Sequence, residues 1–331
     1  MDLPPNIVID HVVLDRDLDD LTGFVQRCNM AESGRTLLTR DEIETRLKMP
    51  GVDLPTDTLI LRDGDGAMVG AEWVAVSAPH VQFRATGFVD PGRIGEGIGT
   101  AMIDWARGRA TEQLGHAPDG ARVVFTSTTD ADHRPGIELF ESRGMGPQRY
   151  FLEMRVDFDG PPPQAAVPDG ISIRNYVAGE DDVPIYNAIT DAFRDHFGFV
   201  DKPQDEGLAV FRTWVASPMF DPALWWIAEA NGEAVASNVC WGSVEGDDGI
   251  GYVASLGVRK PWRGRGLAAA LLSIAFGEFW RRGKHSATLH VDADSLTGAT
   301  RLYRKVGMRE TERFVIYAAV LREGTDLSTS G

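Results

Sequence analysis

The stretch RKPWRGRGLAAALL, residues 259–272, decides the fold of the second half of the chain. The apolar segment before it, GIGYVASLGV (249–258), predicts a strand, and the residues after Gly266 predict a helix. The first N–H groups of that helix lack internal partners, and glycines let the preceding turn present its own N–H groups as well. With Arg263 and Arg265 beside them, the pattern predicts a pocket for a di- or polyphosphate. A glycine-rich turn with solvated arginines remains the alternative.

Composition excludes several classes of protein. The chain has 331 residues, a net charge of −16 and 43% apolar residues, as globular proteins do. The acidic charge argues against nucleic-acid binding, and no apolar run is long enough to cross a membrane. The first residues do not resemble a secretory signal, and Cys28 and Cys240 form no metal-ligand spacing. We therefore expect a cytoplasmic protein with free thiols, no metal, and no nucleic-acid or membrane partner.

The order of predicted elements repeats in the two halves of the chain. A Pro-, Gly- and Ala-rich segment, DFDGPPPQAAVPDG (157–170), separates them. In each half a strand, helical segments, two strands, a third strand, a glycine turn with a helix, a strand, a short helix and a last strand follow in turn. We predict a duplicated α/β protein with an N-terminal domain at 1–157, a linker at 158–169 and a C-terminal domain at 170–331.

The second half resembles the GNAT family of acetyl-CoA-dependent N-acetyltransferases. The family signature, Arg/Gln-x-x-Gly-x-Gly/Ala, is matched by the six residues from Arg263 to Ala268, in the order Arg263, Gly264, Arg265, Gly266, Leu267 and Ala268. Downstream, DADSLTGATRLYRKVGM (292–308) is similar to the family's fourth-helix segment, with Ser295 where Asn is frequent. The resemblance implies two tandem GNAT-type domains of the mycothiol synthase type. Each would have a mixed, mostly antiparallel central sheet flanked by helices.

The resemblance also implies a mechanism. Acetyl-CoA would lie along the strand before the turn, beside Ser255, Leu256, Gly257 and Val258, with its phosphates at the glycine turn and Ser295 nearby. A small-molecule primary amine would attack the acetyl group directly. Tyr303 would then give a proton to the leaving thiolate as general acid. A buried aromatic on a short amphipathic helix is the alternative interpretation of Tyr303.

The resemblance leaves the general base and the acceptor site less defined. Several relatives place a Glu on the strand before the turn, where this chain has Tyr252. Glu245, His290, Asp292 or a water molecule remain as candidates for the base. We predict that the loop RDHFGFVDKPQDEG (194–207) lines the acceptor cleft, through Asp195, His196, Phe197, Phe199 and Asp201.

The first half is expected to be a degenerate copy. Ile94 replaces the signature Arg, Glu96 places a carboxylate at the turn, and Phe140 stands where the second half has Tyr303. The second half alone, from about Pro168, is therefore expected to hold all catalytic groups. A protein or peptide acceptor, a non-catalytic acetyl-CoA-binding regulator and an interaction scaffold remain alternatives. The sequence does not decide between a monomer and a homodimer.

Overall fold

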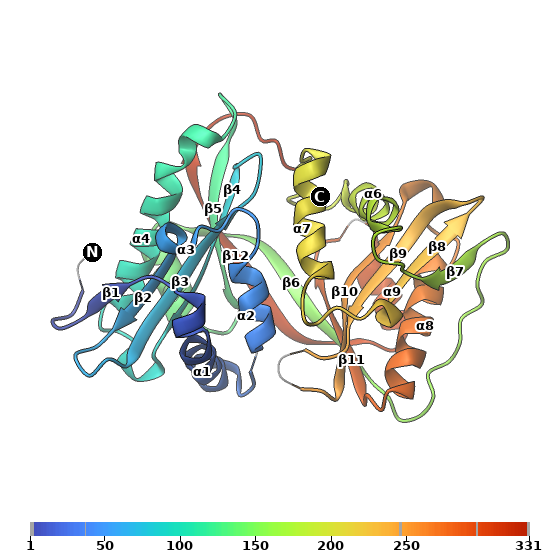
Figure 1. Cartoon of the computed structure of the whole chain (residues 1–331), viewed down its shortest axis with the longest axis horizontal. Coiled ribbons are helices and arrows are strands. Elements are labelled where there is room, and N and C mark those ends of the chain that lie inside the picture. Colours follow the sequence, from blue (N-terminus) through green and yellow to red (C-terminus); the bar gives the residue numbers. More distant parts are fainter. Residues whose placement is uncertain (1–2, 37, 245–246, 296, 330–331) are drawn as a thin grey trace. The chain divides into compact units, whose positions relative to one another are not determined.

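The computed structural model describes residues 3–36, 38–244, 247–295 and 297–329 (Figure 1). The chain forms two compact units. Unit 1 contains the residues up to Tyr150 together with Arg313–Leu327, and unit 2 contains Phe151–Glu312 together with the last residues from Ser328.

Unit 1 is an α/β unit around one mixed sheet with the strand order β1-β2-β3-β4-β5-β12. Among the described strands of this sheet, β4 and β5 pair in parallel and the remaining pairs are antiparallel. Helix α4 packs closely on one face of this sheet, since there is no room for a Cβ at Gly70 of β3 beside Met102 and Ile98 of α4. The elements in chain order are β1 (Val8–Asp10), α1 (Leu14–Ser33), α2 (Arg40–Leu47), α3 (Leu54–Asp57), β2 (Thr58–Arg62), β3 (Met68–Val76), β4 (Gln82–Val89), η1 (Pro91–Arg93), α4 (Ile98–Glu112), η2 (Leu114–His116), β5 (Val123–Asp130) and α5 (Arg134–Ser142).

Unit 2 repeats this plan with the strand order β6-β11-β10-β9-β8-β7. Here β10 and β11 are the parallel pair. The elements from residue 146 onward are β6 (Gly146–Asp157), β7 (Ser172–Asn175), α6 (Asp182–Phe193), α7 (Gln204–Val215), η3 (Pro222–Leu224), β8 (Trp225–Ala230), β9 (Glu233–Trp241), β10 (Ile250–Val258), η4 (Lys260–Trp262), α8 (Leu267–Arg281), β11 (Ser286–Asp292), α9 (Ala299–Lys305) and β12 (Arg309–Arg322), of which β12 pairs in the sheet of unit 1. The predicted class, a tandem α/β fold with mixed, mostly antiparallel sheets, is confirmed.

Several local predictions are confirmed in unit 2. Strands β8 and β9 form a hairpin around Asn231 and Gly232, which both adopt positive φ, as a type I′ turn requires. Residues 158–170 contain no regular helix or strand. This segment is nevertheless held against α8, since Ser273 Oγ donates to Pro163 O and accepts from Ala165 N.

The two halves of the sequence exchange their last strands. Strand β6, from the first half, pairs with β11 from Ser286↔Asp157 to Asp292↔Phe151. Strand β12, from the second half, pairs with β5 in unit 1. The compact units therefore differ from the predicted division at 1–157 and 170–331, because each sheet takes an outer strand from the other half. A fragment that begins at Pro168 would lack β6, and with it the strand that covers one edge of β11.

The core of unit 2 lies on both faces of its sheet. A Cβ at Gly251 would meet the ring of Phe279 on α8, whereas one at Gly257 would meet Ala192 and Phe193 of α6. Helices α6 and α8 therefore cover opposite faces (Figure 1). Helix α8 is apolar at most positions, and its fully buried residues Leu267, Leu271, Ala275 and Phe279 follow the helical repeat, so that one side of the helix lies against the sheet.

Candidate active site

The glycine turn opens helix α8 as the sequence predicts. Gly264 and Gly266 adopt φ values of 75° and 88°, which residues with a Cβ adopt only under strain. Gly266 is the N-cap residue, and it makes no side-chain cap. The first N–H groups of α8 are therefore left for another acceptor, and the helix dipole is positive there. Such a backbone is suited to an anionic ligand.

Strands β10 and β11 diverge beside that turn. They pair from Ile250↔Ser286 to Tyr252↔Thr288, whereas β9 pairs with β10 up to Val258. In the part of the chain that the structure describes, residues 255–258 thus pair with β9 on one edge only. This edge is where the sequence places the pantetheine arm, beside Ser255, Leu256, Gly257 and Val258.

A β-bulge in β10 determines which side chains share a face. The register with β9 shifts between Val253 and Ser255. Gly251 and Gly257 are an even number of residues apart, so a regular strand would place both on the same face. Instead, Gly251 faces α8 and Gly257, after the shift, faces α6. Since neighbouring side chains alternate along a strand, Tyr252 lies on the same face as Gly257. Tyr252 therefore lies on the face of the sheet that α6 covers, which is also the face of Gly257 in the diverging segment.

The four cations of residues 259–265 divide into two pairs. Arg259 binds Asp191, with 3.0 Å from Nη2 to Oδ2, and also contacts Glu233. Arg263 binds protein acceptors as well. Lys260 and Arg265 are exposed, and the Arg265 guanidinium lies 4.7 Å from the ring centre of Trp262. Two cations therefore secure the turn to α6 and the loop after it, and two remain at the surface beside it.

Arg263 uses four of its five N–H donors within the protein. Nη1 and Nη2 donate to the two carboxylate oxygens of Asp195 at 2.5 and 2.9 Å. Nη2 also donates to Ala192 O, and Nε donates to Val258 O. The guanidinium lowers the pKa of the Asp195 carboxyl. Arg263 thus connects the end of α6 to the end of β10, and Asp195, expected to line the acceptor cleft, is its partner.

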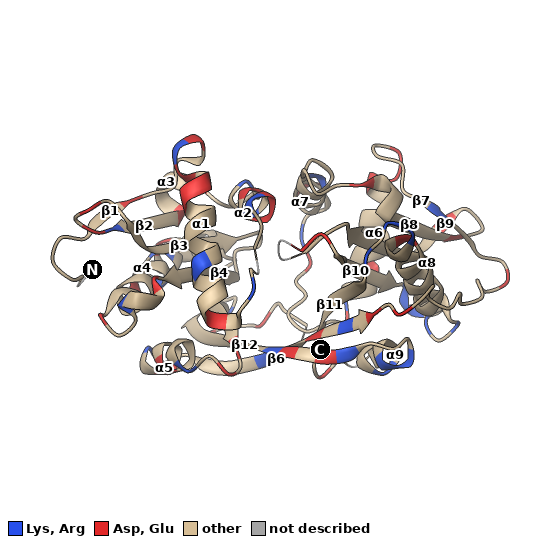
Figure 2. Ribbon diagram, turned by 90° about the horizontal axis from the view of Figure 1, so that it is seen from below, with Lys and Arg blue, Asp and Glu red and all other residues tan. Residues whose placement is uncertain are grey.

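Tyr303 lies on the inner side of α9, and its side chain is 8% exposed. Burial raises the pKa of its hydroxyl to about 12, so the group holds its proton at neutral pH. Figure 2 shows basic residues on the same short helix, and Arg301, Arg304 and Lys305 are exposed there. Ser295, before this helix, bonds Thr297 through its hydroxyl and Asp292 O through its N–H.

The predicted acceptor loop is half-buried and is attached to the end of the chain. Thr329 N donates to Phe199 O, and Gly198 N donates to Thr329 O. The ring of His196 lies 4.5 Å from that of Phe193, and burial lowers the pKa of its imidazole. Asp201 is exposed and pairs with Arg194. Phe197, the remaining residue predicted there, is partly buried.

The candidate bases occupy different places. Glu245 lies outside the described residues. His290 Nδ1 lies 3.0 Å from the Tyr252 hydroxyl, and Asp292 ends β11 two residues further on. Sequence reasoning considered His290 but missed this contact. The alternation of β11 places His290 and Asp292 on one face, but the partner of His290 depends on the register between β10 and β11.

Unit 1 keeps the turn but changes the side chains around it. Gly95 and Gly97 adopt φ values of 90° and 85°, and Gly97 is the N-cap of α4. Glu96 pairs with Arg93 at 2.7 Å, and Ile94 is 51% exposed. Phe140 is buried, with its ring 5.5 Å from that of Tyr317.

An ion pair in unit 1 joins α1, which contacts β4, to His133, which contacts β5. Helix α1 contacts β4 through Cys28, whose thiol approaches Val89 O at 3.4 Å. His133, before α5, contacts Thr129 of β5 at 3.2 Å. Glu32 Oε1 of α1 lies 2.9 Å from His133 Nδ1 and raises the pKa of that imidazole. The pair therefore connects elements on the two sides of the strand divergence.

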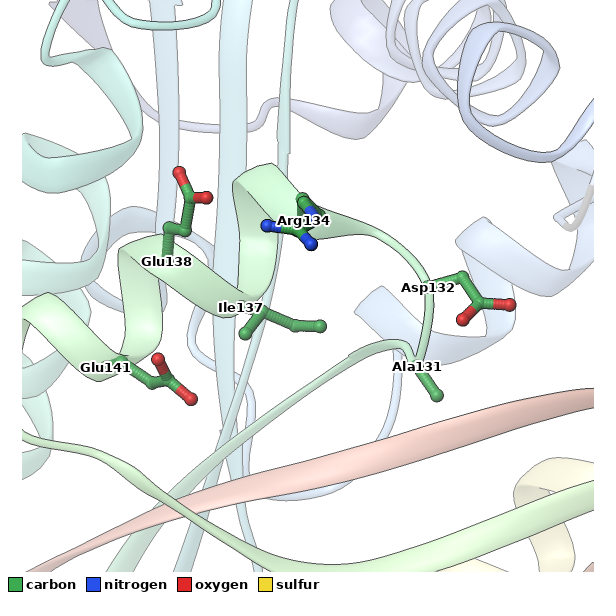
Figure 3. Close-up of a pocket in the computed structure, with 6 residues that line it drawn as sticks. All are labelled: Ala131, Asp132, Arg134, Ile137, Glu138 and Glu141. Atoms are coloured by element: carbon green, nitrogen blue, oxygen red, sulfur yellow. The ribbon is translucent and has the colours of Figure 1, made fainter.

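One pocket of the surface lies away from these groups. A pocket of about 410 Å³ lies on α5 and the loop before it (Figure 3). Its lining mixes acidic and basic groups with Ile137, and includes none of the predicted site residues. Across the described ranges, no group of three or more His, Cys, Asp or Glu side chains is placed to hold a metal. None of the helices described there is long and apolar enough to cross a membrane.

These features define a GNAT-type acetyltransferase, and comparison with known proteins shows the same. Residues 184–308 match the Acetyltransferase (GNAT) family. A mycothiol acetyltransferase from Thermomonospora curvata is 32% identical over 232 residues, which cover 69% of this chain and 71% of the relative. A mycothiol acetyltransferase from Streptomyces coelicolor is 27% identical and covers 82% of both chains. The chain belongs to the GNAT family and is an N-acetyltransferase.

Solved structures agree over the full length. A GCN5-related N-acetyltransferase from Sphaerobacter thermophilus superposes with a TM-score of 0.79 at 29% identity, covering 98% of this chain and 99% of the other. A tandem GNAT protein from the clavulanic acid biosynthesis pathway gives a TM-score of 0.72 at 16% identity, covering 96% and 99%. The second similarity supports the tandem fold alone. The family uses acetyl-CoA as acetyl donor, so acetyl-CoA is a substrate of the reaction rather than a resident cofactor.

Proposed function

We propose that unit 2 transfers acetyl from acetyl-CoA to the primary amine of a small thiol, as the names of the mycothiol acetyltransferase relatives suggest. The observation that carries the proposal is the free amino end of α8, which follows a strand whose second edge is open. The donor's phosphates would bind the N–H groups of the turn, and its pantetheine arm would lie along residues 255–258.

Tyr303 is the proposed general acid. Its raised pKa keeps the hydroxyl protonated, as the protonation of a leaving thiolate requires. Because the amine attacks the acetyl carbonyl directly, no nucleophilic side chain is needed. Unit 1 has Phe140 in the corresponding helix, and a phenyl ring donates no proton. We therefore assign catalysis to unit 2 and treat unit 1 as a degenerate copy.

Proposed acceptor contacts come from the loop after α6. His196, Phe197 and Phe199 are half-buried there, and His196 lies close enough to Asp292 for the two charges to interact. Asp195 positions Arg263 and is proposed to act on the acceptor only through the shape of the loop.

The test is a panel of amines with acetyl-CoA. The panel contains the unacetylated precursor of mycothiol, cysteine, aminosugars, polyamines and short peptides. Because two of these acceptors carry thiols, the acetylated product is measured by mass spectrometry rather than with a thiol reagent. We expect the mycothiol precursor to react fastest.

Two matched variants assign the activity to a unit. Gly266→Asp should abolish transfer, whereas Gly97→Asp, at the same position of the other turn, should keep most of it. A faster reaction with peptides would replace the small-amine assignment. No transfer to any amine, in a protein that binds acetyl-CoA, would favour a regulatory role instead.

A further inference from the structure

The transfer reaction needs a proton acceptor, which the proposed function does not supply. A primary amine is mostly protonated at neutral pH, and only the neutral form attacks a carbonyl. One proton must therefore leave the amine before or during the attack, and a group near the acetyl carbonyl has to receive it.

Tyr252 lies where the two central strands part. Tyr252↔Thr288 is the last pair in the register of β10 with β11, and the segment proposed to hold the pantetheine arm begins three residues later. The bulge after Val253 puts Tyr252 on the same face as Gly257, next to α6. Tyr252 thus lies at the point where β10 and β11 begin to separate, next to the segment where the acetyl group would be presented.

His290 is the bonding partner of Tyr252 on the neighbouring strand. Tyr252 Oη and His290 Nδ1 are 3.0 Å apart, and the rings meet edge to face with centres 5.7 Å apart. His290 is solvent-exposed, so a proton that it accepts can pass to water. On its other side, His290 is directly opposite Glu153 of β6 in an antiparallel pair. Side chains so placed lie roughly 5 Å apart at Cβ.

Glu153 belongs to the first half of the sequence. Its side chain is fully buried and contacts the Thr311 hydroxyl of β12. The carboxyl group of Glu153 thus faces the imidazole of His290 across the antiparallel pair. The row Tyr252, His290, Glu153 therefore crosses three adjacent strands, and its last member reaches unit 2 only because β6 is exchanged.

We infer that Tyr252 and His290 form the proton-accepting pair of the transferase. The ammonium of the acceptor donates to the Tyr252 oxygen, while the Tyr252 hydroxyl gives its proton to His290 Nδ1. The amine becomes neutral, Tyr252 is unchanged and His290 becomes an imidazolium. The amine then forms the C–N bond as the C–S bond breaks, and Tyr303 protonates the leaving thiolate. The second proton of the attacking nitrogen restores the Tyr303 hydroxyl, and the proton on His290 leaves to water. The inference depends on the proposed function of unit 2.

The charged and titratable groups around His290 must be considered in any pH experiment. They are Tyr252 on β10, Asp292 on its own strand, Glu153, Arg155 and Asp157 on β6, Arg309 on β12, and His196 on the loop after α6. All of them are retained in the variants below, except the group that is replaced.

The experiment compares Tyr252→Phe and His290→Gln with the wild type from pH 6 to pH 10. The assay measures acetylated mycothiol precursor at saturating acetyl-CoA. At pH 7 we expect each variant to be slower by about 10²-fold, the lower range for a lost general base. The deficit should shrink about tenfold per pH unit up to the pKa of the acceptor amine, because free amine then needs no base.

The control is His285→Gln, which changes an exposed histidine just before the same strand and should leave the rate unchanged at every pH. Calorimetry should give wild-type affinity for acetyl-CoA in all three variants. A deficit equal at every pH would mean a structural role, and no deficit would mean another base; either overturns the inference. If the wild type itself transfers no acetyl to any amine, the proposed function fails and the inference fails with it.

Discussion

The Arg263–Asp195 pair allows a sharp test of how the turn binds phosphate. The sequence suggests that Arg263 contacts the phosphates directly, whereas in the structure four of its five N–H donors already bind Asp195, Ala192 O and Val258 O. The two hypotheses predict different results for the four proteins of a double-mutant cycle: the wild type, Arg263→Ala, Asp195→Asn and the double variant.

One hypothesis is that Arg263 only holds α6 and β10 together, a role that we call a brace. In that case the net charge near the turn determines the affinity for acetyl-CoA. The pair is neutral in the wild type and in the double variant, negative in Arg263→Ala and positive in Asp195→Asn. One charge at roughly 8 Å from a phosphate changes the binding energy by about 0.5–2 kcal/mol for effective dielectric constants of about 80 to 20. Calorimetry with acetyl-CoA should therefore show about 2- to 30-fold weaker binding for Arg263→Ala and tighter binding for Asp195→Asn.

The double variant decides between the hypotheses. A brace predicts affinity close to that of the wild type, because the net charge is restored. A direct phosphate contact predicts that the double variant stays as weak as Arg263→Ala, by about 1.5–3 kcal/mol. Circular dichroism must show that each variant is folded, since Arg263→Ala also loses the bonds between α6 and β10. A double variant as weak as the single one would refute the brace.

Three further predictions concern the other groups. Gly266→Asp should abolish acetyl-CoA binding measured by calorimetry, because it adds a strained side chain and a negative charge at φ 88°, whereas Gly97→Asp should leave turnover within about twofold. Tyr303→Phe should lower the single-turnover rate by about 10²–10⁴-fold with unchanged acetyl-CoA affinity, and a wild-type rate would exclude it as the acid. The raised pKa of His133 implies stabilisation that is complete at pH values below the ordinary imidazole pKa and lost as pH rises through the raised value. Glu32→Gln should therefore lower the melting temperature at pH 6 but not at pH 9, and an equal loss at both would exclude the ion pair as its cause.

The sequence predicts those parts of the site that depend on backbone conformation. A glycine turn between a strand and a helix has few alternative structures, so Gly264 and Gly266 could be placed from their spacing alone. The partner of Arg263 could not, because Asp195 lies 68 residues away and several acids near it were equally suitable by charge. The Tyr252–His290 contact depends on a parallel register and a bulge, and spacing along the chain reveals neither.

The exchange of β6 and β12 was beyond sequence reasoning for a related reason. Both strands are long, and each has exposed residues at its start and mainly buried or partly buried residues where it pairs with β11 or β5. Because the halves are similar, β6 suits the outer edge of either sheet in hydrophobic pattern, and so does β12. The short connections α5–β6 and α9–β12 also have similar lengths in both copies. The choice therefore depends on particular contacts, such as Arg309 with Asp157 and Thr311 with Glu153, each of which joins residues more than 150 positions apart. Such contacts couple the halves chemically: by placing Glu153 opposite His290, the degenerate copy contributes a carboxyl group to the sheet of the copy that we propose to be catalytic.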